Sequence, residues 1–547
     1  MPERYLVCVA WPYVNGSLHV GHIAGAYLPA DIFARFHRLQ GHAVLMVSGS
    51  DEHGTPITVR AEQEGVAPGV IADRYHAEFL ECWAKLGISF DLYTRTGTAN
   101  HRAVVHDFFL TLLERGHIYK DTMLSPYCEV DRRFLLDRYV LGTCPHCGYP
   151  EARGDQCDQC GKPLDATELI APRCRFCGTA PVIRETEHFF LNLPAFTEQL
   201  LAWVRQQTHW RPTVQRFTIG LLEGGVPPRP ITRDLEWGVP VPLPGWDNKR
   251  IYVWFEAVIG YLSASIEWAQ RQGDPEAWRP WWEDPATRSY YFIGKDNISF
   301  HTIIWPAMLL GKGGLNLPYD VPANEYLNLG GQKISTSRGW GIWLPDLLAA
   351  YDPDPIRYMI AANMPETRDA DWSMDEFFRR NNDELVATYG NLAHRTLTFL
   401  QRYYEGRVPE APGGNAPEPA VAERVAATFE AVTAGLAAAR FKEPLREIMA
   451  LAQFGNRYFD ERAPWRQVKE DRAACATTLV NLLYLLDGLK VLFAPYLPHS
   501  SARLHALLGY TDALEAHGWQ AQPLPAGRPL PKPTPLFVKL EPAAAEV

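Results

Sequence analysis

The chain has 547 residues, of which 47% are hydrophobic and 21% are charged, and its formal net charge is −10. One hydrophobic core cannot hold this many residues, so we expect two to four domains. The negative balance counts mildly against a nucleic-acid protein, although a local basic stripe, not net charge, decides that affinity. Because the sequence has no signal peptide and no run of about 18 apolar residues, we expect a cytoplasmic protein without a membrane span.

The first fifty residues predict one strand–helix–strand unit. Residues 4–10 are rich in strand-forming residues, and residues 19–41 place apolar side chains at helical spacing up to a glycine that can cap the helix. A second strand-like run covers residues 43–47. This order predicts an α/β fold with a Rossmann-like parallel sheet, which binds a ligand at the carboxyl ends of its strands.

The rest of the chain completes this sheet and adds a helical part. Residues 60–120 predict helices with short breaks, and residues 250–310 alternate between strand and helix again. From about residue 376 onward helical periodicity prevails, which indicates an all-α bundle. The tail, residues 522–547, contains seven prolines and is expected to run over the surface. We therefore expect a first half of the sheet domain at 1–120, an insertion at 121–230, a second half at 231–320, a linking segment at 321–375, and a helical domain with its tail at 376–547.

Six of the ten cysteines fall in three CxxC pairs, which in a large cytosolic chain favours metal ligation over disulfides. Two of these pairs, Cys144 with Cys147 and Cys157 with Cys160, have the spacing of a closed tetrahedral zinc site. Zinc would supply folding energy that this glycine-rich and charge-rich segment lacks. The alternative is four reduced, uncoordinated thiols.

The third pair, Cys174 with Cys177, has no obvious partner pair. Upstream, Cys128 and Asp131 have CxxD spacing, so a second site of three thiolates and one carboxylate is chemically possible. The alternative is a pair that no longer binds metal. The sequence leaves the two open, and predicts one or two structural zinc ions.

Two short motifs suggest nucleotide binding. The residues HVGH, with His19, Gly21 and His22, open the first helix directly after the first strand, where free backbone N–H groups favour phosphate. A glycine-rich loop later carries Lys333, Ser335, Thr336 and Ser337, which can close over phosphates. Taken singly, each motif has an ordinary alternative: two structural histidines, and a solvated loop.

As a pair, these motifs resemble the signature of the class I aminoacyl-tRNA synthetases. The resemblance to the methionyl-tRNA synthetases extends over nearly the whole chain, through AWPYVNG (10–16), DEHGTP (51–56), VWFEAVIGY (253–261), GKDN (294–297), FH (300–301) and APW (463–465). It departs from that family at Thr336, where a second lysine is usual, at Val258, where proline is usual, and at Glu256, where aspartate is usual. The first departure puts part of the phosphate-binding role in doubt.

The resemblance implies an α/β catalytic domain with a zinc-knuckle insertion, followed by an all-α anticodon-binding bundle. It implies three partners, ATP with Mg²⁺, L-methionine and tRNA(Met), and no nucleophile from the protein, so that catalysis comes from positioning and charge stabilisation. His19, His22 and Lys333 would be catalytic. ATP would be bound by His19, Gly21, His22, Gly294, Asp296, Lys333, Ser335, Thr336 and Ser337. Methionine would be bound by Trp11, Tyr13, Asp51, Arg233, Trp254, Ala257, Tyr261 and His301. The anticodon would be bound by Asn391, Arg395 and Trp465.

The span between the sheet halves holds mainly the cysteine pairs and leaves no room for an editing domain. An apolar pocket rejects a substrate that lacks one methylene by only about 1–3 kcal/mol, so synthetases for valine, isoleucine and leucine need such a domain. A class I enzyme for another amino acid, a zinc-containing RNA adaptor without catalysis, and a small nucleotidyltransferase are the alternatives. Because no appended oligonucleotide-binding module follows residues 537–541, we expect a monomer.

Overall fold

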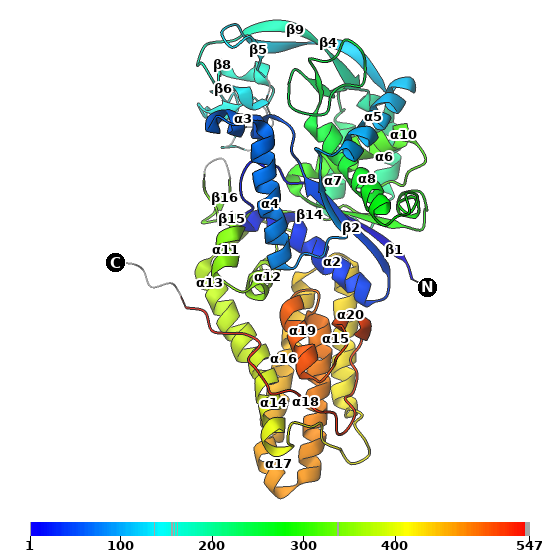
Figure 1. Ribbon diagram of the computed structural model, residues 1–547, viewed down its shortest axis with the longest axis vertical. Helices are drawn as coiled ribbons and strands as arrows, with labels where there is room; N and C mark the ends of the chain where they lie inside the picture. Colours follow the sequence, from blue (N-terminus) through cyan, green and yellow to red (C-terminus); the bar gives the residue numbers. More distant parts are fainter. Residues whose placement is uncertain are drawn as a thin grey trace, which may run out of the picture.

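The computed structural model describes residues 2–135, 137–154, 157, 159–160, 162, 164–335 and 339–541. Its upper half in Figure 1 is an α/β unit with an insertion at the top, and its lower half is a bundle of helices. The chain therefore has the predicted α/β sheet domain followed by an all-α bundle.

A five-stranded sheet forms the centre of the α/β unit, in the order β14-β13-β1-β2-β3. Every pairing between these neighbours is parallel, and the side chains of the first strand are nearly all buried. The chain runs outward from β1 in one direction, then returns after the insertion to build the other side. The strand order thus reverses between β1 and β13, where a doubly wound sheet opens a crevice for a ligand. The strands are β1 (Arg4–Val9), β2 (Ala43–Ser50), β3 (Leu92–Arg95), β13 (Arg288–Gly294) and β14 (Ala323–Asn324).

Helices cover both faces of this sheet. The first helix comes after β1 and is continuous through α1 (Val20–His22), η1 (Ile23–Tyr27) and α2 (Leu28–Leu39). Its middle segment, η1, is a π-helical turn. A matching π-helical segment, η6 (Phe300–Ile304), follows β13 and leads into α10 (Trp305–Lys312). The others are α3 (Thr55–Glu64), α4 (Pro68–Leu86), α5 (Ala99–Glu114), α8 (Val253–Arg271), α9 (Arg279–Trp282) and η5 (Lys295–Asn297).

The prediction of helices alone across residues 60–120 was wrong at one place, because β3 lies there and forms an edge of the parallel sheet. A four-residue strand between two long helices offers too few positions for a period of two to be recognised.

The insertion is built on a long antiparallel pair, β4 (Ile118–Cys128) with β9 (Val182–Leu191), which crosses the top of Figure 1. A second, smaller sheet has the order β7-β6-β8. Its core is small and contains four of the cysteines, Cys128, Cys144, Cys157 and Cys174. The remaining elements are β5 (Arg133–Phe134), η2 (Asp137–Tyr139), β6 (Val140–Thr143), β7 (Ala152–Arg153), η3 (Ala166–Glu168), β8 (Ile170–Cys174), η4 (Leu193–Phe196), α6 (Thr197–Arg205), α7 (Pro212–Glu223), β10 (Arg229–Pro230), β11 (Thr232–Arg233) and β12 (Arg250–Ile251).

A linking segment joins the sheet to the bundle. It contains a small sheet in which β15 pairs antiparallel with β16 and parallel with β17. Lys333 ends β16 and is thereby held close to the end of the main sheet. The elements are β15 (Leu327–Leu329), β16 (Gln332–Lys333), α11 (Leu344–Ala350), α12 (Pro353–Ala362) and β17 (Ala370–Trp372).

The bundle begins with one long helix that has a wide central part. It runs through α13 (Met374–Arg379), the π-helical η8 (Arg380–Gly390) and α14 (Asn391–Tyr403). One helix, α18 (Arg472–Phe493), is long and apolar enough to cross a membrane, but 89% of its apolar window is buried inside the protein, as expected for a core helix. The others are α15 (Pro419–Ala437), α16 (Lys442–Arg462), α17 (Pro464–Glu470), α19 (Pro498–Leu507) and α20 (Leu514–His517).

The proline-rich tail follows the bundle, but the prediction that it merely runs over the surface was incomplete. Its apolar side chains, Leu524, Leu530, Leu536 and Phe537, are buried against the bundle core. An extended chain rich in proline loses little conformational entropy on docking, so a few apolar anchors suffice to hold it.

Arg357 of α12 joins the two halves of the molecule. Its guanidinium is fully buried and donates to the Asp31 carboxylate of α2 at 2.6 Å and to the carbonyl oxygens of Tyr496 and Pro495, at 2.7 and 2.8 Å, after the last turn of α18. Burial alone would raise the pKa of Asp31, but Arg35 and Arg357 outweigh it and hold that pKa well below its usual range. The carboxylate is therefore charged, and a buried ion pair ties the sheet domain to the bundle.

Candidate functional site

A cavity of about 450 Å³ lies at the carboxyl ends of β1 and β13, where the strand order reverses. Among its lining residues are both motif histidines and the motif lysine, which are more than 300 residues apart in the sequence. The predicted residues that line it are Trp11, Tyr13, His19, Gly21, His22, Asp51, Trp254, Ala257, Tyr261, Gly294, Asp296, His301, Lys333 and Ser335. Thr336 and Ser337 lie outside the described residues.

The two motif histidines cap the first helix reciprocally. The backbone N–H of His22 donates to Nδ1 of His19 at 3.3 Å, and the backbone N–H of His19 donates to Nδ1 of His22 at 3.2 Å. Their rings stack with centroids 3.7 Å apart. This is a capping box in which imidazoles take both side-chain positions.

The capping geometry also fixes the protonation state of both rings. Burial lowers the pKa of His22 to about 4, and burial together with the neighbouring His22 lowers the pKa of His19 well below its ordinary value. Both rings are therefore neutral near pH 7. Because each Nδ1 accepts a backbone hydrogen bond, the ring proton is on Nε2. Two N–H donors at a helix N-terminus thus border the cavity, an arrangement suited to phosphate oxygens.

Lys333 forms an ion pair across the cavity with Asp296, which follows β13. The Lys333 ammonium lies 3.1 Å from the Asp296 carboxylate and 4.0 Å from the centre of the Tyr326 ring. The Tyr326 hydroxyl donates to the same carboxylate. The motif lysine and Asp296, both predicted to bind ATP, therefore pair with each other in this structure.

An aromatic slot lies at the other end of the cavity. The Trp254 indole donates to the Tyr13 hydroxyl, and its ring meets Phe300 edge to face at 4.4 Å. The Tyr261 hydroxyl lies 2.7 Å from Nε2 of His301, while Nδ1 of His301 lies 2.9 Å from the Asn297 carbonyl oxygen. A carbonyl oxygen can only accept, so Nδ1 of His301 carries a proton. In the neutral ring Nε2 is then unprotonated and accepts from the Tyr261 hydroxyl. Burial accordingly lowers the pKa of His301 to about 4.

Trp11 forms the floor of this slot and depends on a glycine. A Cβ added to Gly260 of α8 would lie 2.8 Å from the Trp11 ring, so any larger residue there would force the indole out. Aromatic rings of this kind suit an apolar, polarizable side chain such as a thioether.

Asp51 lies beside the slot and is prepared to bind a cation. The carboxylate is 3% exposed and accepts the backbone N–H of His53 at 3.3 Å, but it forms no ion pair with another described residue. Burial, followed by the nearby Glu256 carboxylate, raises the pKa of Asp51 well above its ordinary value. An ammonium group in the cavity would relieve both effects.

A buried polar cluster beneath Asp51 was missed by the sequence reasoning. Glu256 of α8 is fully buried and lies 2.9 Å from Nδ1 of His53 and 3.5 Å from Nε2 of His101. Burial works to lower the pKa of His53, but the Glu256 carboxylate outweighs it and the net pKa is raised. The position where Glu256 replaces the usual aspartate thus carries a structural ion pair, and only its proximity to the quoted segments could have signalled it.

The insertion supplies part of the cavity wall, which no sequence signal indicated. Arg138, Arg153 and Cys157 line the cavity opposite the sheet. Arg233, in contrast, does not line it. Its guanidinium lies 4.0 Å from the centre of the Tyr252 ring and donates to the carbonyl oxygens of Pro230 and Thr232, at 3.1 and 3.0 Å.

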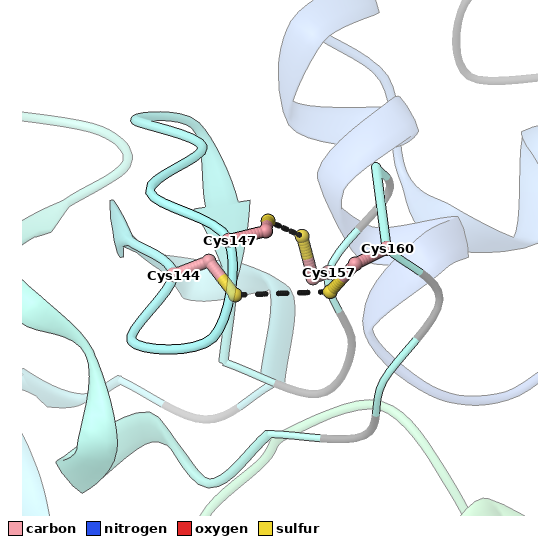
Figure 2. Close-up of side chains that lie close together, drawn as sticks. All are labelled: Cys144, Cys147, Cys157 and Cys160. Carbon is pink, nitrogen blue, oxygen red and sulfur yellow. Dashed lines mark hydrogen bonds between the residues drawn. The ribbon is translucent and has the colours of Figure 1, made fainter.

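Both predicted groups of metal ligands converge. Figure 2 shows that Cys144 faces Cys160 and that Cys147 faces Cys157. The two sulfurs are 3.9 Å apart in the first pair and 3.6 Å apart in the second. Tetrahedral ligation at a Zn–S distance of about 2.3 Å would place sulfurs about 3.8 Å apart. These separations are far longer than a disulfide bond.

The second group has the same compactness. The sulfurs of Cys128 and Cys177 are 3.4 Å apart, and the Asp131 carboxylate lies 2.9 Å from the Cys174 sulfur. The ligand atoms of each group all lie within 4.8 Å of one another. Either group could hold a metal ion.

The three residues predicted to read an anticodon lie on neighbouring helices of the bundle. Arg395 pairs with Asp460 at 2.7 Å and stacks on Phe459, with its guanidinium 4.2 Å from the ring centre. Trp465 of α17 stacks on the same Phe459 and is 41% exposed. Asn391 donates to the side chain of Asn456 at 3.4 Å. An exposed indole supported from behind is a suitable platform for an unstacked base.

Known proteins match the chain over both halves. Residues 5–397 match the family described as tRNA synthetases class I (M), and residues 408–546 match the anticodon binding domain of methionyl tRNA ligase. A methionine–tRNA ligase of Thermomicrobium roseum is 56% identical over 573 residues, covering 100% of this chain and 98% of the relative. One of Dehalococcoides mccartyi is 57% identical over 546 residues, covering 100% and 99%. The solved structure of Mycobacterium tuberculosis methionyl-tRNA synthetase in complex with methionyl-adenylate is similar, with a TM-score of 0.79 at 28% identity over 98% of this chain and 99% of that chain.

Proposed function

This chain belongs to the methionyl-tRNA synthetases of class I, and from this we propose that it uses ATP to activate methionine and then loads it onto tRNA(Met). The observation that supports this most is the single cavity that HVGH and Lys333 share at the switch point of the sheet. Neither a zinc-containing RNA adaptor nor a solvated loop would require that meeting.

In the first step, a carboxylate oxygen of methionine attacks the α-phosphorus of ATP. The new O–P bond forms in line as the bond to the bridging oxygen of pyrophosphate breaks, giving methionyl-adenylate. His19 and His22 would donate Nε2–H to oxygens on which charge develops, and Lys333 with Ser335 would hold the departing pyrophosphate. Asp296 would accept hydrogen bonds from the ribose hydroxyls once Lys333 turns to the phosphates.

Methionine itself would lie in the aromatic slot. Its ammonium would pair with Asp51, and its thioether would lie among Tyr13, Trp254, Tyr261 and His301, over Trp11 and Ala257. Arg233 remains the least supported of the proposed contacts, because its guanidinium is engaged with Tyr252 and with backbone carbonyls.

In the second step, a hydroxyl of the terminal tRNA ribose attacks the carbonyl carbon of the adenylate. The ester forms as AMP leaves, so the proton of the hydroxyl can pass to the departing phosphate. The bundle would hold the anticodon through Asn391, Arg395 and Trp465. The elongated molecule suits this division, with anticodon binding in the bundle at one end and transfer of the aminoacyl group in the α/β unit at the other.

We also propose that two zinc ions hold the insertion, one in each cysteine group, since the donor atoms suit tetrahedral zinc in kind and spacing. Both sites would be structural, because four protein ligands leave no open position. Mg²⁺ would accompany ATP and offset the charge of its phosphates. The protein would act in the cytoplasm as a monomer, with its five segments divided at residues 120, 230, 320 and 375.

Amino-acid-dependent exchange of pyrophosphate into ATP tests the proposal directly. We expect exchange with methionine and little with valine, isoleucine or cysteine. Exchange with one of those amino acids in place of methionine would mean a different class I enzyme. RNA binding without any exchange would mean an adaptor and would contradict the proposed activity.

A further inference from the structure

A second cavity, of about 530 Å³, lies in the bundle outside the site described above. It is walled by α12, by the start of the long helix that contains η8, and by the first three turns of α16. Its floor is apolar, with Leu445 and Met449, and its rim carries four cations. Those four are Arg379, Arg380, Lys442 and Arg446.

The cations divide into two pairs with different surroundings. Arg379 and Arg380 are neutralised within their own helix by Glu376 and Glu384. Lys442 and Arg446 form no ion pair with any described residue. Glu366, the acid whose charge acts on Lys442, is already engaged, because it accepts the backbone N–H groups of Phe441 and Lys442 at 2.6 and 3.0 Å.

Asp383 and Glu384 also line the cavity, but neither forms an ion pair with Lys442 or Arg446. Burial lowers the pKa of Lys442, and of the neighbouring charges Glu366 opposes that effect while Arg446, Arg368 and Arg380 add to it. Since Arg368 is also exposed and forms no ion pair with another described residue, three cations here lack an anion. A polyanion that brings several phosphates would suit them better than a single small ion.

The cavity continues into the surface that carries the anticodon candidates. Thr388 lines the cavity, and its carbonyl accepts from Asn456 at 2.9 Å. Asn456 in turn accepts from Asn391, and one turn further Arg395 meets Asp460 and Phe459. The cavity and the anticodon candidates therefore lie along one line between the long helix and α16, and we call this line of residues the groove. Along α16 it extends about 21 Å from Arg446 to Asp460, the length of several stacked nucleotides.

From this geometry we propose that the upper part of the groove, with Lys442 and Arg446, grips the phosphates of the tRNA strand that leads from the anticodon toward the acceptor end. The inference rests on the proposed function, because it takes tRNA as the partner. The π-helical η8 fits this assignment, since such segments occur frequently at functional sites. The two ends of the groove would then bind different parts of the tRNA. Trp465 would contact bases, whereas Lys442 and Arg446 would contact only the phosphate backbone.

Phosphate contacts carry no sequence information, so they can be separated from base contacts by experiment. Filter binding would measure Kd for two transcripts, tRNA(Met) and the same tRNA with a changed anticodon. We expect Arg446→Gln to raise Kd about fivefold for both, and to reduce the slope of log Kd against log salt by about one. Trp465→Ala should weaken binding of the first transcript strongly and of the second little.

Two control variants, a stability measurement and an activity assay complete this test. Arg446→Lys should retain most of the affinity, since it keeps the charge, and Arg424→Gln on α15 removes a cation outside the groove and should change nothing. An unchanged Kd for Arg446→Gln, a loss confined to the tRNA with the methionine anticodon, or an equally weak Arg424→Gln would overturn the proposal. So would a lower melting temperature of Arg446→Gln that accounts for its loss. Methionine-dependent pyrophosphate exchange needs no tRNA, so its absence from the wild type would refute the proposed function instead.

Discussion

The paired imidazoles of His19 and His22 are a device for presenting two neutral N–H donors at one helix end. The Nδ1 of each ring accepts the backbone N–H of the other residue, so the tautomer is set before any ligand binds. Donors that are already oriented need no reorganisation during the reaction, which is what makes them effective in stabilising developing charge.

His22→Ala should therefore slow methionine activation about 100-fold, or roughly 3 kcal/mol in the transition state, with a smaller change in KM for ATP. The measurement is the kcat of pyrophosphate exchange. The substitution also removes one half of the capping box, so a thermal-unfolding curve should accompany it. A correctly folded variant with near-normal kcat would show that His22 has no part in the chemistry.

Asp51 predicts a dependence of methionine binding on pH. Its pKa is raised in the ligand-free protein by burial and then by Glu256, and only its anionic form can pair with the methionine ammonium. As pH falls through that raised pKa, the carboxylate becomes protonated and can no longer pair with the ammonium. KM for methionine should therefore begin to rise at a pH well above the ordinary carboxyl pKa, which is about 4.

Asp51→Asn should raise KM for methionine strongly and remove this acid limb, because amide oxygen does not titrate. Measuring exchange rates across the acidic range for both proteins tests it. If the limb persists unchanged in Asp51→Asn, another group is responsible for it.

Residue-level sequence reasoning worked where a motif adjoins a strand end. HVGH opens the first helix after β1 and Asp296 follows β13, so their meeting is a consequence of parallel topology. It did not find Arg138 and Arg153, because their place in the cavity depends on how the insertion docks onto the sheet. Nor did it find the role of Glu256, whose histidine partners come from two other elements.

With zinc bound as proposed, the insertion is the part of the chain whose fold would depend most on metal. Its small hydrophobic core includes four of the candidate ligands, Cys128, Cys144, Cys157 and Cys174, so these cysteines also take part in packing. Zinc binding in such a segment is folding free energy.

We expect about two equivalents of zinc per chain by atomic absorption. Removing one pair, as Cys174→Ala with Cys177→Ala, should reduce this to one, because only two ligands of the second group remain. Cys82→Ala, outside both groups, should keep two. One equivalent in the wild type that the double substitution leaves unchanged would mean that Cys128, Asp131, Cys174 and Cys177 form no metal site.

At the element scale, long amphipathic helices and apolar strands were predictable, but short or irregular elements were not. β3 has four residues and carries no clear period. The tail lacks regular structure, yet Leu536 and Phe537 bury themselves against helices formed earlier in the chain. The π-helical parts leave no mark on a pattern that is read with a period of 3.6 residues.

For the molecule as a whole, Arg357 is the strongest single link between the sheet domain and the bundle. Arg357→Leu would leave Asp31 with Arg35 as its one ion-pair partner among the described residues, beside two hydrogen bonds from Ser89. It would also remove the donor to the carbonyl oxygens of Pro495 and Tyr496. Breaking a buried pair on one side typically costs about 3–5 kcal/mol.

Urea denaturation of Arg357→Leu should therefore show a loss of that size, with the two halves unfolding in separate transitions. Arg4→Ala provides the matched control, because its ion pair with Asp284 is largely exposed and should contribute less than about 1 kcal/mol. Since the pKa of Asp31 is held low in the folded protein, the contribution of this pair is present above pH 4 and disappears on acidification. A loss under 1 kcal/mol, or one unaffected by acid, would contradict this role.

The ion pair between Lys333 and Asp296 has a consequence for how nucleotides are discriminated. In the ligand-free protein the Lys333 ammonium and the Asp296 carboxylate neutralise each other, so opening the pair leaves both without a partner. A whole nucleotide would supply a partner to each, with phosphates for the ammonium and sugar hydroxyls for the carboxylate. Inorganic triphosphate would occupy one side and leave the other without a partner. Because both side chains are nearly half exposed, this penalty should be less than about 1 kcal/mol, so inorganic triphosphate should compete with ATP somewhat less well in the exchange reaction. Under the proposed ATP binding, the ligand-free protein would therefore favour an intact nucleoside triphosphate modestly.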